Sequence, residues 1–119
     1  MGLRLSHTTW DALDPHTIAE FWRELTGWEV SEPESYHPGS DECYLVTPDG
    51  YTILFFRVPD AKRLKNRAHM DLRHSGTSRD EEVERALRLG ATMVDDRRED
   101  LSWAVLADPE GNEFCILDG

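Results

Sequence analysis

The segment Asp14–Trp28, DPHTIAEFWRELTGW, has the pattern of one amphipathic helix with both of its ends marked. Asp14 and Pro15 are residue types that favour the N-cap and the first position of a helix. The apolar residues that follow recur at the spacing of one helix face and are Ile18, Phe21, Trp22 and Leu25. Gly27 suits the position just after a helix, where a positive φ is common. We therefore predict a helix between Asp14 and Gly27.

Strands are predicted on both sides of this helix. Short runs rich in β-branched and aromatic residues lie there, separated by a polar loop at Pro33–Asp41 and by the turn Pro48-Asp49-Gly50. The predicted strands of the first half are Leu3–Leu13, Trp28–Val30, Cys43–Thr47 and Tyr51–Val58.

The second half of the chain repeats this order after a polar connector at Pro59–Asn66. Ser78 is a favourable N-cap, and Gly90 is expected to end the helix that follows it. We predict a charged loop at Asp95–Asp100 and a turn at Asp108–Asn112. The predicted strands of the second half are Arg67–Arg73, Thr92–Val94, Trp103–Ala107 and Phe114–Leu117.

Matching landmarks in the two halves lie at a nearly constant distance along the sequence. Three pairs are separated by 62, 63 and 61 positions: His7 and His69, Gly27 and Gly90, and Gly50 and Gly111. A shift this regular across residues of different kinds indicates an internal duplication. We predict one α+β domain over residues 1–119, made of two βαβββ units at about 1–58 and 67–119, with His7 superposing on His69.

The composition excludes several classes of protein. A net charge of −11 leaves no basic patch for nucleic acid or for an anionic membrane surface. No apolar run reaches the length of a membrane-spanning helix, and the first residues lack the apolar core of a signal peptide. Two cysteines, Cys43 and Cys115, do not make a disulfide framework. We therefore expect a cytoplasmic protein with reduced thiols and with no nucleic-acid or membrane partner.

Three stretches carry a family resemblance: Asp14–Trp28, Asn66–Leu72 and Ala107–Cys115. They resemble the vicinal oxygen chelate superfamily, which includes glyoxalase I, bleomycin-resistance proteins and extradiol dioxygenases. The third stretch is the most specific, because it is similar to the Asp-Pro-x-Gly-Asn turn of that superfamily. Its ending, Phe114-Cys115, points to a glyoxalase-like subgroup whose members mostly lack an assigned reaction.

The resemblance implies an open barrel built from the two βαβββ units, which encloses a cleft and has its helices packed outside. It also implies a homodimer. Metal-using members hold a divalent ion in the cleft, on residues of the first and last strands of each unit. In this chain the resemblance places those ligand positions at His7, Leu54, His69 and Cys115.

This set of ligands is incomplete. Leu54 offers no lone pair, and the Cys115 thiol would have to lose a proton that apolar surroundings help it to keep. We therefore predict no cofactor and no stoichiometric metal, with His7 and His69 as the candidate ligands if a divalent metal does bind. Otherwise the two histidines are cleft residues hydrogen-bonded to neighbours such as Asp71.

The candidate catalytic residues are His69, Asp71 and Glu113. Asp71 shares a strand face with His69, so the two can act as a general base and the group that orients it. Asp71 can instead form a plain ion pair with Arg73 or Arg67. Glu113 lies two residues before Cys115, where it is either a ligand or base in the cleft or a solvated carboxylate at the end of a turn.

Strand alternation selects the remaining cleft residues, because it turns Leu54 and Phe56 to one face and Ile53 and Phe55 to the helices. The residues predicted to line the ligand cleft are His7, Leu54, Phe56, His69, Asp71, Trp103, Glu113 and Cys115. An apolar cleft with a few polar groups suits a small organic molecule.

Two functions are compatible with the resemblance. The first is a glyoxalase-like enzyme, a lyase, an isomerase or a dioxygenase, that acts on an unknown small substrate. The second is a metal-free protein that sequesters a ligand, as bleomycin-resistance members do. The acidic chain favours cationic ligands. The sequence leaves open whether the chain is an enzyme.

Overall fold

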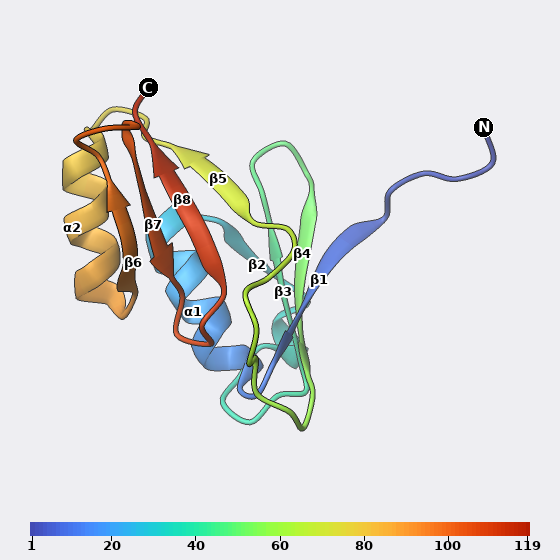
Figure 1. Cartoon of the computed structure of the whole chain (residues 1–119). Helices are drawn as coiled ribbons and strands as arrows, with labels where there is room; N and C mark the ends of the chain where they lie inside the picture. Colours follow the sequence, from blue (N-terminus) through green and yellow to red (C-terminus); the bar gives the residue numbers. More distant parts are fainter. The chain divides into compact units, whose positions relative to one another are not determined.

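The computed structural model describes residues 1–119, which divide into unit 1, Met1–Ala61, and unit 2, Lys62–Gly119 (Figure 1). Unit 1 contains β1 (His7–Ala12), α1 (Pro15–Thr26), β2 (Glu29–Ser31), a short 3₁₀ helix η1 (Pro33–Ser35), β3 (Glu42–Val46) and β4 (Thr52–Arg57). Unit 2 contains β5 (Met70–Arg73), α2 (Arg79–Leu89), β6 (Thr92–Arg97), β7 (Trp103–Ala107) and β8 (Glu113–Leu117). The predicted order of one helix after the first strand and three strands after the helix is confirmed in both units.

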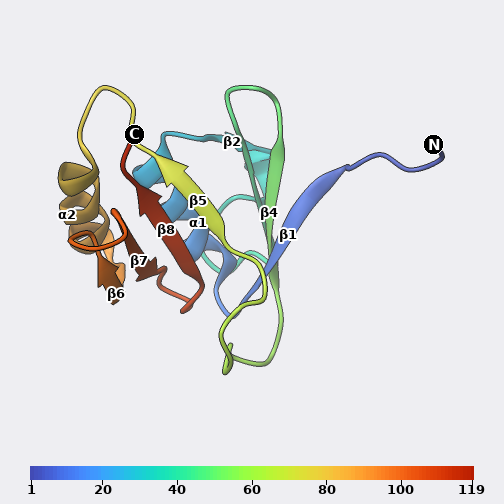
Figure 2. The same cartoon turned by 45° about the horizontal axis from the view of Figure 1, so that its top comes forward.

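Each unit forms its own four-stranded sheet, and the two sheets have the same topology. The strand orders are β1-β4-β3-β2 and β5-β8-β7-β6. In each sheet the first and last strands of the unit pair in parallel and the other neighbours pair antiparallel (Figure 2). The α+β class and the two βαβββ modules are therefore confirmed, and neither sheet is closed.

The two helices begin and end where the sequence predicts. Asp14 caps α1, because its carboxylate accepts hydrogen bonds from the backbone N–H and the hydroxyl of Thr17 at 3.4 and 2.7 Å. Gly27 ends α1 with a φ of +78°, a conformation that costs glycine little. Ser78 caps α2, because its hydroxyl oxygen accepts from the backbone N–H of Glu81 at 3.2 Å.

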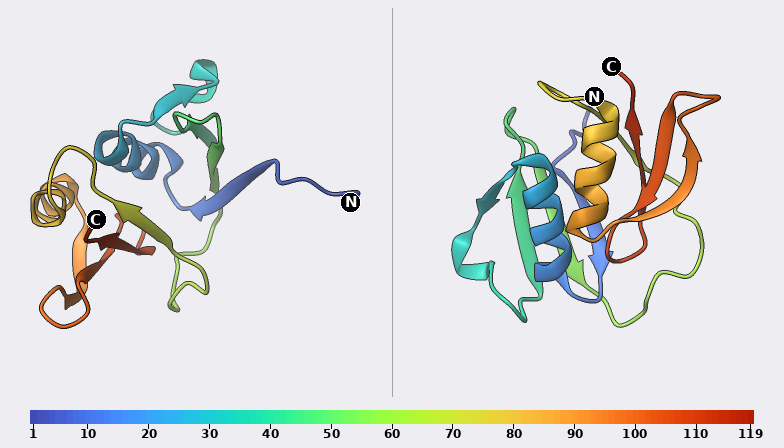
Figure 3. Two further views of the ribbon diagram at one scale, coloured as in Figure 1. Left: turned by 90° about the horizontal axis from the view of Figure 1, so that it is seen from above. Right: turned by 90° about the vertical axis from the view of Figure 1, so that its left-hand side faces the viewer.

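Each helix packs on one face of the sheet of its own unit (Figure 3). Helix α1 contacts β3 and β4 through an apolar face that includes the fully buried Ile18 and Trp22. Helix α2 is more polar and buries only Val83 and Ala86, with β8 as its main neighbour. Side chains alternate along the strands, so that Phe55 of β4 completes the core of unit 1, and Phe114 and Ile116 of β8 complete the core of unit 2.

The turn before β8 fixes the start of that strand. The buried carboxylate of Asp108 accepts hydrogen bonds from the backbone N–H groups of Glu110 and Asn112 at 2.9 and 3.0 Å. The Asn112 amide donates to the same carboxylate at 3.1 Å, and Gly111 takes a φ of +89°. The Asp-Pro-Glu-Gly-Asn motif is therefore a closed local network that delivers Glu113 into the sheet.

Several predicted boundaries are wrong. The first strand begins at His7 and not at Leu3, because the preceding residues have no partner strand and Leu3 is fully exposed. The strand predicted from Arg67 begins only at Met70. The predicted charged loop at Asp95–Asp100 is partly strand, since β6 continues to Arg97 after an irregularity in its register. Its charges do not prevent pairing, because they lie on an exposed strand surface.

Neither helix is long and apolar enough to span a membrane.

Candidate functional site

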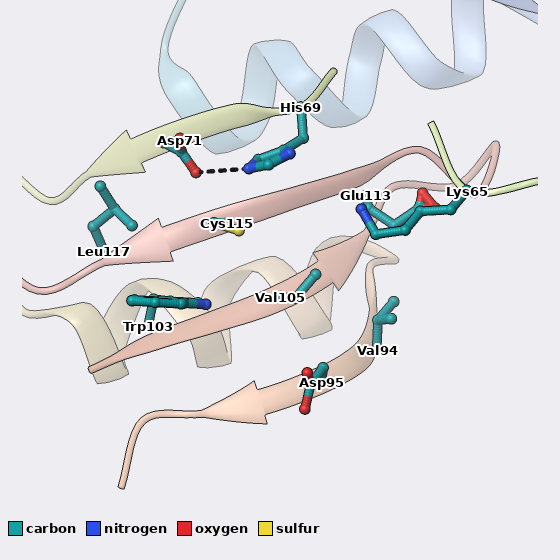
Figure 4. Close-up of a pocket in the computed structure, with 10 residues that line it drawn as sticks. All are labelled: Lys65, His69, Asp71, Val94, Asp95, Trp103, Val105, Glu113, Cys115 and Leu117. Atoms are coloured by element: carbon teal, nitrogen blue, oxygen red, sulfur yellow. Dashed lines mark ion pairs between the residues drawn. The ribbon is translucent and has the colours of Figure 1, made fainter. Parts of the chain in front are cut away.

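A pocket of about 470 Å³ lies within unit 2 (Figure 4). Its lining residues are Lys65, His69, Asp71, Val94, Asp95, Trp103, Val105, Glu113, Cys115 and Leu117. Strand alternation explains the set, because the intervening residues of β7 and β8 are buried on the side of α2. The pocket therefore opens on the sheet face opposite the helix, and its volume is in the range of small-molecule sites.

Three polar side chains gather on one wall of this pocket. The register of β5 and β8 places Asp71 directly opposite Cys115, and His69 lies just before β5. The Nε2 atom of His69 lies 3.3 Å from Oδ1 of Asp71, and both side chains are about half exposed. The ligand atoms of His69, Asp71 and Cys115 all lie within 4.8 Å of one another. Asp71 therefore contacts His69 and forms no salt bridge with Arg67 or Arg73.

The Cys115 thiol is buried beside this pair. Burial raises its pKa to about 11, and the charge of Asp71 and a hydrogen bond to that carboxylate act in the same direction. The thiol is therefore protonated at neutral pH and can donate to Asp71. Such a group is a poor nucleophile, as the apolar neighbours of Cys115 in the sequence predict.

Glu113 is held at the edge of the pocket by the connector. Its carboxylate accepts from Nζ of Lys62 at 2.9 Å and from the backbone N–H of Asn66 at 3.4 Å. The Asn66 side chain also pairs with the Glu113 backbone, accepting from its N–H at 2.9 Å and donating to its carbonyl at 3.3 Å. Burial alone would raise the pKa of Glu113, but the hydrogen bonds from Lys62 and from backbone N–H groups outweigh it and lower the pKa.

The alternative of a solvated turn-end carboxylate is wrong for Glu113, because the residue is only 8% exposed and is anchored to Lys62 and Asn66. Sequence reasoning did not detect this role because Lys62 lies 51 positions away in a segment without secondary structure.

The opposite wall of the pocket is mainly apolar. Trp103 and Val105 of β7 present neighbouring side chains on one face, with Val94 and Asp95 of β6 beyond them (Figure 4). Leu117, at the end of β8, lies on the other side, near Asp71. The pocket thus combines an apolar surface, which can bury part of an organic ligand, with a polar wall, which can orient it.

Five of the eight residues predicted to line a ligand cleft lie together in this pocket: His69, Asp71, Trp103, Glu113 and Cys115. The other three, His7, Leu54 and Phe56, belong to unit 1. His7 is exposed and its Nδ1 contacts the hydroxyl of Ser6 at 2.9 Å. Leu54 is buried, whereas Phe56 is 40% exposed and lines a different hollow within unit 1. A ligand-binding role for all eight residues stays a prediction.

Sequence reasoning missed five lining residues: Lys65, Val94, Asp95, Val105 and Leu117. Alternation from Trp103 and Cys115 would have identified Val105 and Leu117. Lys65 had no such signal, because it belongs to an irregular segment.

The cluster of His69, Asp71 and Cys115 offers one nitrogen, one carboxylate and one thiol to a metal. Borderline ions such as zinc accept this combination, so a metal is possible there. Ions that prefer six oxygens, such as Mn(II), fit the set poorly. The raised pKa of Cys115 further opposes metal binding at neutral pH, because a thiol must lose its proton to become a ligand.

Comparison with known proteins places this geometry in a family. The model of the glyoxalase-like domain matches residues 7–117. The fosfomycin resistance protein FosX from Mesorhizobium loti is similar over 100% of this chain and 94% of its own, with a TM-score of 0.76 and 16% identity. A FosX variant from Listeria monocytogenes, complexed with Mn(II) and 1S,2S-dihydroxypropylphosphonic acid, covers 100% of this chain and 92% of its own, with a TM-score of 0.73 and 22% identity.

A possible glyoxalase from Bacillus cereus is also similar, over 98% of this chain and 99% of its own, with a TM-score of 0.69 and 15% identity. At these identities the structural similarity shows the fold alone. No curated protein matches the chain. Because the family model spans nearly all of the sequence, the chain belongs to the glyoxalase-like family of the vicinal oxygen chelate superfamily.

Proposed function

We propose that this protein binds a small organic molecule in the pocket of unit 2. The observation that carries the proposal is the placement of the His69–Asp71 pair across the pocket from the apolar wall of Trp103 and Val105. An apolar surface facing a few convergent polar groups is the usual composition of a small-molecule site. The small-molecule phosphonate bound by the Listeria FosX variant is consistent with this use of the fold.

A second candidate function is proton transfer to or from the bound molecule. Asp71 contacts Nε2 of His69, so it can orient the imidazole and leave Nδ1 available for a ligand. Isomerase and lyase reactions need proton transfers of this kind. We therefore favour an isomerase or lyase if the protein is an enzyme, and the alternative is a protein that sequesters its ligand unchanged.

Binding can be tested by NMR with a library of small organic fragments and the isotope-labelled full chain. We expect fragments to shift the amide resonances of pocket residues. His69→Ala and Trp103→Ala should each weaken the affinity for these fragments by about tenfold, as for the loss of a buried contact. Leu64→Ala is the control, because Leu64 is 83% exposed and does not line the pocket. Fragments that bind only to unit 1, or to neither unit, would refute the proposal.

Proton transfer has its own readout. A fragment that binds and carries an acidic C–H bond should exchange that hydrogen with deuterated solvent, and His69→Ala should abolish the exchange. Binding without exchange in the native protein would favour sequestration.

The metal requires a separate measurement. We predict that the purified protein holds no stoichiometric divalent ion, because the Cys115 thiol is protonated and one imidazole with one carboxylate makes a weak site. Elemental analysis and calorimetric titration with zinc, iron(II), nickel and manganese test this. A metal bound at His69, Asp71 and Cys115 would supply a Lewis acid to the pocket. Submicromolar binding that is lost in His69→Ala would contradict the metal-free prediction, and His7→Ala tests the other predicted ligand.

Homodimerisation, a cytoplasmic location and the lack of nucleic-acid and membrane partners remain predictions. Sedimentation of the full chain at micromolar concentration tests the first, and a monomer would contradict it.

A further inference from the structure

The connector fastens Lys65 at the mouth of the pocket. Lys62 and Asn66, on either side of Lys65, are both bound to Glu113 of β8, by an ion pair at 2.9 Å and by three hydrogen bonds of 2.9 to 3.4 Å. A segment held at both ends has few conformations, so the backbone of Lys65 is fixed relative to the sheet. Figure 4 shows its side chain extending beside Glu113, near the start of β8.

The acidic residues that line the pocket already have basic partners. Asp71 pairs with His69 at 3.3 Å, Asp95 with Arg97 at 3.6 Å, and Glu113 with Lys62 at 2.9 Å. Lys65 takes part in none of the ion pairs of the structure and is exposed. The ammonium group of Lys65 therefore has no ion-pair partner within the chain and can bind a charged ligand.

Lys65 lines the same pocket as Trp103 and Val105. An anion placed between Lys65 and the sheet would thus meet a positive charge at the rim while the rest of its surface lies against Trp103 and Val105.

We propose that Lys65 is the anion subsite of the pocket and that the ligand is a small organic acid with one carboxylate and a flat apolar body. The carboxylate would lie at Lys65 and the body against Trp103. This inference rests on the proposed small-molecule function and specifies the class of ligand for the same site.

A single negative charge is favoured over two. Lysine is a point charge without the paired donors that guanidinium offers to a phosphate, and Lys65 is the one lysine or arginine that lines the pocket. A dianion would also be repelled more strongly than a monoanion by the net charge of −11. The indole of Trp103 favours an aromatic ring, because flat rings stack on it with a large buried area.

Three matched probes test the charge preference: phenylacetate, phenylacetamide and 2-phenylethylamine, which share a ring and differ in charge. NMR titration of the full chain should show phenylacetate binding the pocket more tightly than the other two. Lys65→Gln should weaken phenylacetate by about fivefold and leave phenylacetamide unchanged, as for the loss of one partly exposed charge contact. Lys65→Arg should retain most of the affinity.

Arg63→Gln is the control, because it removes the same charge from the same connector at a residue that does not line the pocket. The inference is overturned if the amide or the amine binds as tightly as the acid, or if Lys65→Gln and Arg63→Gln have equal effects. It is also overturned if none of the three probes shifts a pocket resonance. The proposed function is decided separately by the fragment library, which includes molecules of other shapes and charges.

Discussion

Unit 1 and unit 2 have the same strand order, yet they differ at the position where β1 pairs with β4 and β5 pairs with β8. In unit 1 the register places Thr9 opposite Leu54, and in unit 2 the equivalent residues are Asp71 and Cys115. The same backbone therefore presents one hydroxyl and an alkyl group in one unit, and a carboxylate and a thiol in the other. Two side-chain differences at this pair of positions therefore distinguish the polar pocket wall of unit 2 from the corresponding surface of unit 1.

The backbone of the two units is more alike than their side chains. Gly50 and Gly111 have φ values of +86° and +89° in the turns before the last strands. Glycine is retained at such positions because other residues are strained there. The polar residues next to those turns have diverged, since Thr52 occupies in unit 1 the place that the anchored Glu113 occupies in unit 2. The turns of the two units therefore still show the duplication, whereas the polar side chains of the strands differ between the units.

The first prediction concerns the cores. Phe55→Ala and Phe114→Ala should each lower the free energy of unfolding by about 3–5 kcal/mol, because both rings are fully buried and their loss leaves cavities. Urea denaturation measures the loss, and hydrogen exchange should show faster exchange chiefly in the unit that carries the substitution. Phe56→Ala is the control, because Phe56 is 40% exposed and its loss should lower the free energy of unfolding far less. Equal exchange in both units after either substitution would show that the units do not open separately.

The second prediction concerns the residue that distinguishes unit 2 at its last strand. Glu113→Gln should lower the free energy of unfolding by about 1–3 kcal/mol, because it leaves the half-buried ammonium of Lys62 without its carboxylate. Thr52→Val, at the equivalent position of unit 1, should change the free energy by less than about 0.5 kcal/mol. Both values come from urea denaturation at neutral pH. If Glu113→Gln leaves the free energy of unfolding unchanged, the connector is held without this ion pair.

The third prediction concerns the Glu20 cluster of unit 1, whose counterpart in unit 2 is the pair of Glu82 and Arg85. The carboxylate of Glu20 accepts hydrogen bonds from Arg23 at 2.7 and 3.1 Å and from the hydroxyl of Tyr36 at 2.6 Å. Hydrogen bonding to Arg23 is the main reason why the pKa of Glu20 is lowered to about 2. The folded state therefore gains stability from this group above the ordinary glutamate pKa and loses it as the pH falls towards 2.

After allowance for solvent, this contribution is about 1 kcal/mol. Glu20→Gln should remove that part of the acid sensitivity between about pH 4.5 and pH 2 in urea denaturation curves. Glu84→Gln, at an exposed position on α2 of unit 2, should leave the acid profile unchanged. An unchanged profile in Glu20→Gln would refute the assignment.

The sequence predicted the repeated architecture because its signals are local. Caps such as Asp14 and Ser78, and glycines such as Gly27, act within one turn of chain. The boundary errors arose where pairing with another strand determines the end of an element. In β6, hydrogen bonding to β7 includes Asp95 in the strand despite its low strand propensity.

The site could be predicted only in part for the same reason. His69, Asp71 and Cys115 lie on strands whose alternation is readable from the sequence. Lys65 is placed by contacts between an irregular connector and Glu113, which lies 48 positions further along the chain. Periodic patterns in an amino-acid sequence do not reveal a contact of that kind.

The parallel pairing of the first and last strands also has a consequence for folding. Asp71 and Cys115 are register partners although they lie 44 positions apart, at nearly opposite ends of unit 2. Joining them closes a long loop, and such contacts carry an entropic cost that local contacts do not. They are therefore expected to form late, after α2 and the hairpin of β7 and β8. The polar wall of the pocket is then among the last parts of unit 2 to be assembled, and ligand binding would slow unfolding by holding that final closure in place.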